Sequence, residues 1–240
     1  MDRIPLAVEA SRYDVNRIGE VEGLRQTLYD FQLYPLAGSL GINFFANPQG
    51  AGVTTSPGAA VGSAKTITDT NMELAGQLPN PKAFLVESLE VFFNPGNSAV
   101  ANTFTQQPPY DRVEPPTDLV PLSAGAMSDV WNVLDTGHLQ FFIGSKSYLD
   151  ETPLHRFPPS SGVHVDGAIA ANAPVGDVAA YAIASGRALG RPYYLDPPIF
   201  LRATQNFRVT LDWPALVPTI SGLNGRIGVV LAGYLYRNSQ

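Results

Sequence analysis

Hydrophobic and polar residues alternate most clearly near the C-terminal end of the chain. From residue 206 to residue 213 every second residue is hydrophobic, which is the pattern of a half-buried β-strand. A second stretch, residues 227–236, follows an Asn224-Gly225 turn signal and is apolar on both faces. We therefore expect this strand to be covered on both sides, either as a central strand of a sandwich or against another subunit.

The pattern along the rest of the chain predicts four further strands, over residues 27–34, 40–45, 83–93 and 138–148. In the strand over 83–93, Leu85 lies on the same face as Leu89, and Glu87 is the exception on that face. The residues that we expect in the core are Phe141, Phe207, Val209, Leu211, Trp213, Val229 and Leu231.

Two short helices are predicted between these strands. Residues 127–134 carry hydrophobic residues at helical spacing. Residues 174–186 begin with Pro174 and end with Gly186, which are residue types preferred at the start of a helix and just past its end. A single helical turn is also expected over residues 69–76, with Asp69 or Thr70 as its N-cap.

Three segments predict no regular structure. Residues 1–26 carry balanced charges and are expected to form an extended arm that precedes one domain over residues 27–240. Residues 47–64 are small and polar, so we expect a loop that is flexible or lies along a neighbouring molecule. Residues 94–121 form a long proline-rich connection, and a connection of that length inside a compact domain is normally functional.

The composition fits an all-β protein. The 240 residues include 22 Gly, 21 Pro and 24 aromatic residues (12 Phe, 10 Tyr and 2 Trp), and charged residues make up only 15%, against about 25% in an average globular domain. Only Lys65, Lys82 and Lys146 are lysines, so arginine dominates the cations. Arginine is enriched at protein interfaces and lysine is depleted there, which favours extensive contacts with other subunits.

The net charge of −6 argues against a protein that binds a phosphate backbone strongly. The charges of residues 1–26 cancel, so the arm is no basic nucleic-acid arm. Tyr193 and Tyr194 beside Arg187, Arg191 and Arg202 are the one grouping that could stack bases. We favour packing over nucleic-acid contact for this group.

The sequence predicts no metal site and no cofactor. There is no cysteine, which excludes a disulfide scaffold, a thiolate zinc site and a cysteine nucleophile. Of His138, His155 and His164, only His164 has a carboxylate two residues away, at Asp166, and it lies in an apparent loop. Asp69 with Asn71 supplies oxygen atoms, but the spacing of a calcium loop is missing.

No catalytic residue is predicted either. Gly144-Ser145 lies outside the Gly-x-Ser-x-Gly frame of a serine nucleophile, and no phosphate-binding glycine loop is present. Asp150 and Glu151 are neighbours on an extended chain, so their side chains point to opposite faces and do not form an acid–base pair.

Five segments together carry a family resemblance: residues 69–79, 82–93, 137–149, 198–213 and 225–237. They resemble structural proteins of marine bacteriophages, and their pattern is similar to jelly-roll capsid proteins of tailless icosahedral phages. The resemblance implies a jelly-roll β-sandwich of about eight strands without an active site, assembled through trimers or pentamers into an icosahedral shell. It also implies that the protein is made in the host cytoplasm and resides in the virion.

The expected partners are other copies of the chain and other capsid proteins; contact with an internal membrane or a scaffold stays open. The residues that we expect in these contacts are Ile4, Leu6, Val8, Tyr110 and Arg112. We expect neither a signal peptide nor a transmembrane segment, and we favour one jelly roll over two. Two alternatives remain: a receptor- or carbohydrate-binding β-sandwich, and a jelly-roll enzyme that binds a metal or cleaves glycosides.

Overall fold

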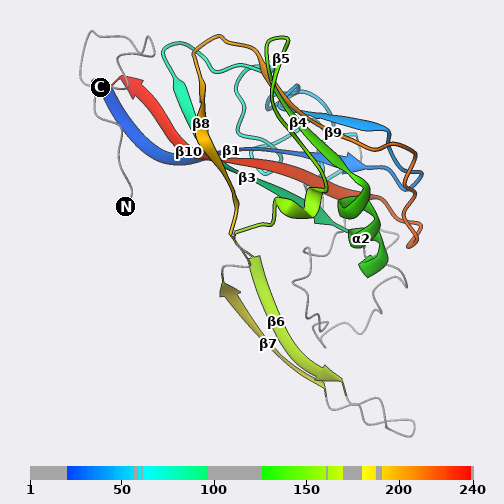
Figure 1. Cartoon of the computed structure of the whole chain (residues 1–240). Coiled ribbons are helices and arrows are strands. Elements are labelled where there is room, and N and C mark those ends of the chain that lie inside the picture. Colours follow the sequence, from blue (N-terminus) through cyan, green and yellow to red (C-terminus); the bar gives the residue numbers. More distant parts are fainter. Residues whose placement is uncertain are drawn as a thin grey trace, which may run out of the picture.

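The computed structural model describes residues 21–56, 59–60, 62–96, 126–160, 162–169, 180–187 and 191–238. These residues form mostly β-strands, with one α-helix and one short 3-10 turn (Figure 1). The elements are β1 (Val21–Tyr34), β2 (Gly41–Phe44), β3 (Ala83–Asn94), α2 (Ala126–Thr136), β4 (His138–Ile143), β5 (Lys146–Glu151), η1 (Leu154–Arg156), β6 (Gly162–Ile169), β7 (Ala180–Arg187), β8 (Tyr193–Leu201), β9 (Phe207–Asp212) and β10 (Gly225–Asn238).

Eight of the strands form two antiparallel sheets of four. Sheet A has the order β1-β10-β3-β8, and sheet B has the order β2-β9-β4-β5. The remaining two strands, β6 and β7, pair only with each other and form a two-stranded ribbon. Figure 1 shows this ribbon running away from both sheets.

The two sheets share one hydrophobic core. Residues of β3 and β10 in sheet A, such as Phe93 and Val229, belong to the same buried cluster as Phe141 of β4 and Val209 of β9 in sheet B. The residues predicted for the core are all buried in this cluster: Phe141, Phe207, Val209, Leu211, Trp213, Val229 and Leu231. The alternation over 206–213 therefore belongs to a strand, β9, with one face in the core and the other face outside it.

β10 lies between β1 and β3 in sheet A, and each of its two faces is buried in a different cluster. One face contributes Val229 and Leu231 to the core. On the other face, Tyr234 and Tyr236 form a second buried cluster with Ala83. Tyr234 and Tyr236 are therefore buried on the outer face of sheet A, outside the main core.

The expected face of Leu85 is wrong because β3 contains a bulge. The register between β3 and β10 shifts next to Ala232 and Gly233, and the register between β3 and β8 shifts between Val86 and Ser88. At this bulge Glu87 is the extra residue, so it pairs with neither β10 nor β8 and the inward and outward positions of β3 change on either side of it. Phe84 and Val86 consequently face the core, whereas Leu85 packs against the second cluster on the outer surface.

The helix predicted over 127–134 is confirmed as α2, but the helix predicted over 174–186 is wrong. Residues 180–187 form β7, which pairs with β6 along its whole length. Pairing with a partner strand overrides the helix preference of the local alanine-rich sequence. Residues 174–179 lie outside the described part of the chain.

The helical turn predicted over 69–76 is also wrong. The Asp69 side chain accepts hydrogen bonds from the preceding loop, and Thr70 forms a bridge with Asp30 of β1. Asp69 and Thr70, which are suited to capping a helix, instead form hydrogen bonds with Thr55 and with the Tyr29 carbonyl of β1.

Other boundaries differ from the prediction. The strand over 138–148 is a hairpin, β4 and β5, that turns at Gly144, where φ is +58°. β1 begins at Val21, so the last residues assigned to the arm belong to a strand. β6 and β8 were not predicted at all; Pro197 and Pro198 hid β8, and His164 lies in β6 rather than in a loop. No described helix is long and apolar enough to span a membrane.

Trp213 joins sheet B to the helix, and replacing it should destabilise the whole fold. Its side chain is only 4% exposed, its indole N–H donates to the Val133 carbonyl over 2.9 Å, and its ring lies 5.3 Å from that of Tyr34. We expect Trp213→Ala to lower the free energy of unfolding by about 3–5 kcal/mol, because it empties a buried aromatic site. Urea denaturation measures this.

The control for Trp213→Ala is Ile67→Ala, since Ile67 is an exposed hydrophobic residue. It should change the free energy of unfolding by no more than about 0.5 kcal/mol. An unchanged unfolding midpoint for Trp213→Ala would show that the ring does not stabilise the core.

Candidate functional site

Four chain connections meet at one end of the sandwich. β1, β3, β5 and β9 end there, and β2, β4, β8 and β10 begin there, as the pairings Tyr34 with Gly225 and His138 with Asp212 show. We call this the crossover end, defined by the described residues of these connections that lie next to the strand ends: 35–40, 95–96, 126–137, 152–156 and 213–224. α2 lies at this end, between β3 and β4 along the chain (Figure 1).

Two of these connections are bonded directly to each other. The Thr219 amide donates to the Leu36 carbonyl, and the Trp213 amide donates to the Leu40 carbonyl, each over 2.9 Å. Gly38 adopts φ +85°, and a Cβ there would lie 2.6 Å from the Val217 backbone nitrogen. Only glycine allows so close an approach in this backbone conformation.

The helix is tied to the same connections. The Asp129 carboxylate on α2 is almost fully buried and accepts hydrogen bonds from the backbone amides of Ile220 and Ser221. The Trp213 indole closes a second link to the carbonyl of Val133. The crossover end is therefore a bonded platform rather than a set of independent loops.

This platform exposes large hydrophobic side chains to solvent. Leu40 and Ile220 are each 59% exposed, and Leu36 and Leu216 are exposed to similar extents. We call these four residues the apolar patch. Leu36 and Leu40 stand in one connection, and Leu216 and Ile220 stand in the connection that is hydrogen-bonded to it.

The β6–β7 ribbon is anchored at both ends of its base. On one side, the Glu90 carboxylate of β3 accepts hydrogen bonds from the Ser160 amide over 3.0 Å and from the Ser160 hydroxyl over 2.6 Å. The carbonyl of Phe157 accepts from the Val91 amide. On the other side, β8 begins at Tyr193, whose ring centroid lies 4.7 Å from that of Phe157. The described residues that precede the ribbon and those that follow it therefore lie together beside β3.

A separate aromatic groove lies between β5 and β8. It has a volume of about 380 Å³ and is lined by residues 148–149 and 193–200. Tyr194 is 63% exposed, Tyr148 is also exposed, and the backbone runs through a cis bond between Asp196 and Pro197. Aromatic rings and a carboxylate around a concave surface are features of a small-molecule site.

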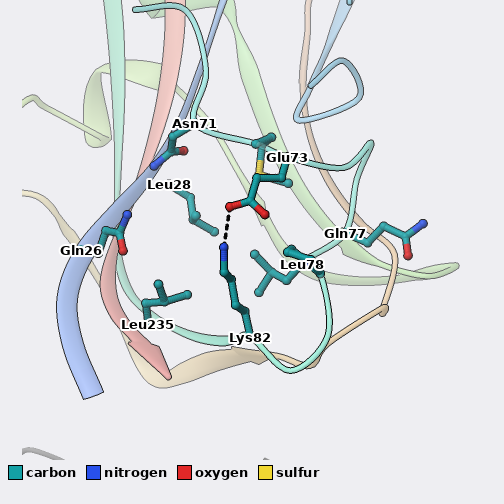
Figure 2. A pocket seen from close by; sticks show the side chains of 10 residues that line it. Gln26, Leu28, Asn71, Glu73, Gln77, Leu78, Lys82 and Leu235 are labelled. Carbon is teal, nitrogen blue, oxygen red and sulfur yellow. Dashed lines mark hydrogen bonds and ion pairs between the residues drawn. The ribbon is translucent and has the colours of Figure 1, made fainter. Parts of the chain in front are cut away.

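The cavity in Figure 2 is too small for a ligand. It has a volume of about 40 Å³, and Figure 2 shows Lys82 and Glu73 reaching toward each other beside the apolar side chains of Leu28, Leu78 and Leu235. The ion pair between Lys82 and Glu73 is partly exposed to solvent. A cavity of this size holds no more than about one or two water molecules.

Part of the loop over 47–64 packs against its own chain, since Thr54 and Thr55 are buried. Lys65, just beyond the loop, is buried and its Nζ lies 2.5 Å from Oδ1 of Asp30 in β1, which is equally buried. Oδ2 of Asp30 also accepts from the Phe45 amide over 2.8 Å. Burial raises the pKa of Asp30, and the Lys65 ammonium opposes that rise.

Asp69 fixes the same loop at a second point. Its carboxylate accepts from the Thr54 hydroxyl over 2.6 Å, the Thr55 amide over 2.8 Å and the Thr66 amide over 2.9 Å. Burial alone would raise the pKa of Asp69, but these hydrogen bonds outweigh it and lower the pKa to about 2. Asp69 is therefore held as an anion that organises the loop.

The structure does not bring the three histidines together at one site. His138 pairs with Asp150 on the outer surface of sheet B, and Nδ1 of His155 lies 3.5 Å from an Asp135 carboxylate oxygen at the crossover end. His164 lies on the ribbon. Within the described ranges, no group of three or more His, Cys, Asp or Glu residues could hold a metal ion.

The expected contact residues cannot be placed. Ile4, Leu6, Val8, Tyr110 and Arg112 lie outside the described part of the chain. Tyr193 and Tyr194 lie on β8, where Tyr193 packs on Phe157 and its hydroxyl donates to Glu151 over 3.3 Å. At least one member of that pair therefore has a packing role.

Comparison with known proteins yields no relative: no family model, no curated protein and no solved structure matches the chain. Its class is therefore defined by the structure alone, as a mostly-β protein with two packed antiparallel sheets.

Two features of this site were missed from the sequence. The apolar patch is formed by isolated leucine and isoleucine residues in two connections far apart in the chain, so no local pattern marks it. The Pro214 and Pro218 signals show that residues 213–224 form a loop, but not that it packs on residues 35–40. Only the pairing of β1 with β10 brings the two connections together.

The buried ion pair between Asp30 and Lys65 gives a direct test of the loop attachment. Asp30→Ala leaves the Lys65 ammonium buried without its carboxylate and removes the acceptor of the Phe45 amide. We expect a loss of about 3–5 kcal/mol in the free energy of unfolding, because an uncompensated buried charge is costly. Chemical denaturation monitored by tryptophan fluorescence measures it.

Glu73→Ala is the matched control, since it breaks the exposed pair with Lys82. Its cost should be about 0–1 kcal/mol. Equal costs for the two variants would mean that the Asp30 contact contributes no more than a surface pair.

Proposed function

We propose that the chain is a coat subunit with a jelly-roll fold, which associates with copies of itself, through trimers or pentamers, into an icosahedral shell. Its partners are other copies and other capsid proteins, it resides in the virion, and it binds nucleic acid only weakly. It catalyses no reaction and uses no cofactor.

The nested pairing of the strands carries this proposal. When β6 and β7 are set aside, the first strand pairs with the eighth, the second with the seventh, the third with the sixth and the fourth with the fifth. This order results when one long antiparallel hairpin is rolled into two sheets of four. It matches the two Greek keys of a jelly roll, an architecture found in viral capsids and in lectin domains.

Three further observations support a coat subunit over other jelly-roll proteins. The chain is poor in charge and prefers arginine to lysine, as proteins with large permanent interfaces do. The crossover end exposes an apolar patch on a bonded platform. The β6–β7 ribbon runs away from both sheets (Figure 1). Closed shells need several such contacts on each subunit.

Whether the purified chain forms particles tests this proposal. Negative-stain electron microscopy of the purified full chain at micromolar concentration should show closed particles or uniform rings. Deletion of residues 1–12, which include Ile4, Leu6 and Val8, should leave a folded monomer or small oligomer that forms no particles.

The control for this truncation replaces only those three hydrophobic residues by serine and keeps the length of the arm. Loss of particles in both variants assigns the contact to the apolar side chains. Normal assembly of the truncated chain would exclude the arm from assembly, and a full chain that stays monomeric at all concentrations would contradict the coat proposal.

The aromatic groove favours one second candidate, a carbohydrate-binding β-sandwich. A sugar ring presents an apolar face to an aromatic side chain and hydroxyl groups to a carboxylate, and the groove offers Tyr194 and Asp196. If the groove binds glycans, Tyr194→Ala should weaken binding on a glycan array by about tenfold, since one stacking platform is lost. Tyr234→Phe in the second cluster is the control. Absence of glycan binding by the unmodified chain would exclude this candidate.

A further inference from the structure

One lysine and one aspartate are enclosed together inside the fold. Nζ of Lys65 lies 2.5 Å from Oδ1 of Asp30, and both side chains are completely shielded from solvent. Side chains alternate between the two faces of a strand, so Asp30 lies on the same face of β1 as Leu28 and Tyr34, which belong to the main core. The pair therefore stands beside apolar side chains rather than in water.

Backbone hydrogen bonds hold both partners in place. Asp30 is paired with Val229 of β10, and it forms a bridge with Thr70 in addition. The Lys65 carbonyl accepts from the Gly50 amide over 2.9 Å. The fold therefore keeps the two side chains against each other, and their contact does not depend on chance collision.

Charge is costly at this position. The attraction between two buried charges repays the loss of their hydration only in part. Burial raises the pKa of Asp30, so its carboxylate accepts a proton more readily than an exposed one. Transfer of one proton from Nζ to Oδ1 removes both charges at once and leaves an amine beside a carboxylic acid. A neutral amine is a nucleophile, whereas an ammonium is not.

We propose that Lys65 and Asp30 condense into an amide, so that an isopeptide bond joins Nζ to Cγ. Nζ attacks Cγ with its lone pair, and the bond between Cγ and Oδ1 breaks. Oδ1 leaves as water and takes two of the three protons of the ammonium, while the third proton stays on the amide nitrogen. Ammonium and carboxylate thus become amide and one water, without any oxidant, reductant or co-reactant.

The other carboxylate oxygen lies where negative charge develops during the attack. Oδ2 of Asp30 accepts from the Phe45 amide over 2.8 Å and from Nε2 of Gln32 over 2.9 Å. Two donors at such distances stabilise the oxyanion that forms when nitrogen adds to a carboxyl carbon. The same two donors hold the carboxyl group in one orientation.

Proximity supplies the rest of the driving force. Because Cγ is bonded to Oδ1, Nζ of Lys65 lies at most one bond length farther from Cγ of Asp30 than from Oδ1. Reactants that a structure holds so close react as if each were present at a very high concentration. The exposed pair of Lys82 and Glu73 lacks this enclosure, so its charges stay hydrated and we expect no amide there.

The bond closes residues 30–65 into a covalent ring. The ring contains β2 and the loop over 47–64. β1 is an edge strand of sheet A, and β2 is an edge strand of sheet B. A covalent link of this kind restricts the unfolded chain, as a disulfide does, so the two edges stay joined when other contacts are lost.

The mass of the intact chain, measured under denaturing conditions, tests the isopeptide bond. We expect the purified full chain to weigh one water molecule less than its sequence. Lys65→Arg keeps a cation beside Asp30 but has no nucleophilic amine, so it should show the full mass. Lys82→Arg is the matched control: it has the same composition as Lys65→Arg and should weigh one water molecule less.

A trypsin digest of the unmodified chain locates the bond, and it does so whether or not Lys65→Arg folds. Residues 26–64 contain neither lysine nor arginine, so an unlinked chain releases the peptide 26–65. An amide on Nζ removes the positive charge that trypsin recognises. The linked chain should therefore release residues 26–82 as one peptide that lacks one water molecule.

Three results would overturn the proposal. The first is a full mass for the unmodified chain, which would leave Lys65 and Asp30 as an ion pair. The second is a water deficit that persists in Lys65→Arg, and the third is a deficit that lies outside residues 26–82. None of these measurements requires assembly, so the isopeptide bond and the coat proposal can fail independently.

Discussion

The pairing of β10 between β1 and β3 is the constraint on which the rest of the structure depends. β1 and β10, each of 14 residues, stand near opposite ends of the chain and pair over their full lengths. This pairing joins the first described strand to the last, and every other pair is nested inside it. Because β10 lies between β1 and β3, sheet A is held together by contacts between residues far apart in sequence.

The same pairing creates the crossover end. Because β1 ends where β10 begins, the connections that follow β1 and precede β10 lie side by side, and Thr219 bonds to Leu36. Asp129 and Trp213 then tie α2 to this platform. The exposed apolar patch is held by backbone bonds rather than by its own side chains, which leaves those side chains available for a contact with another molecule.

The parts of the fold with local signals were predictable. Strict alternation over 206–213 and the two-sided apolar stretch over 227–236 correspond to β9 and β10, and helical spacing over 127–134 corresponds to α2. Failures occurred where a long-range contact overrides a local signal. Ala180–Arg187 has helix-forming alanines but pairs as a strand, and Asp69 bonds to Thr54 and Thr55 instead of capping a helix. For the candidate site, the composition indicated extensive contacts with other subunits. It did not locate the apolar patch or the ribbon, because both depend on the strand pairing.

Self-association of this chain is the central claim, and native mass spectrometry of the purified full chain tests it most directly. The account predicts discrete species at small integer multiples of the 25.7 kDa subunit, with trimers or pentamers prominent and larger assemblies growing as the concentration rises. A single species at the mass of one subunit, unchanged from low to high concentration, would contradict it.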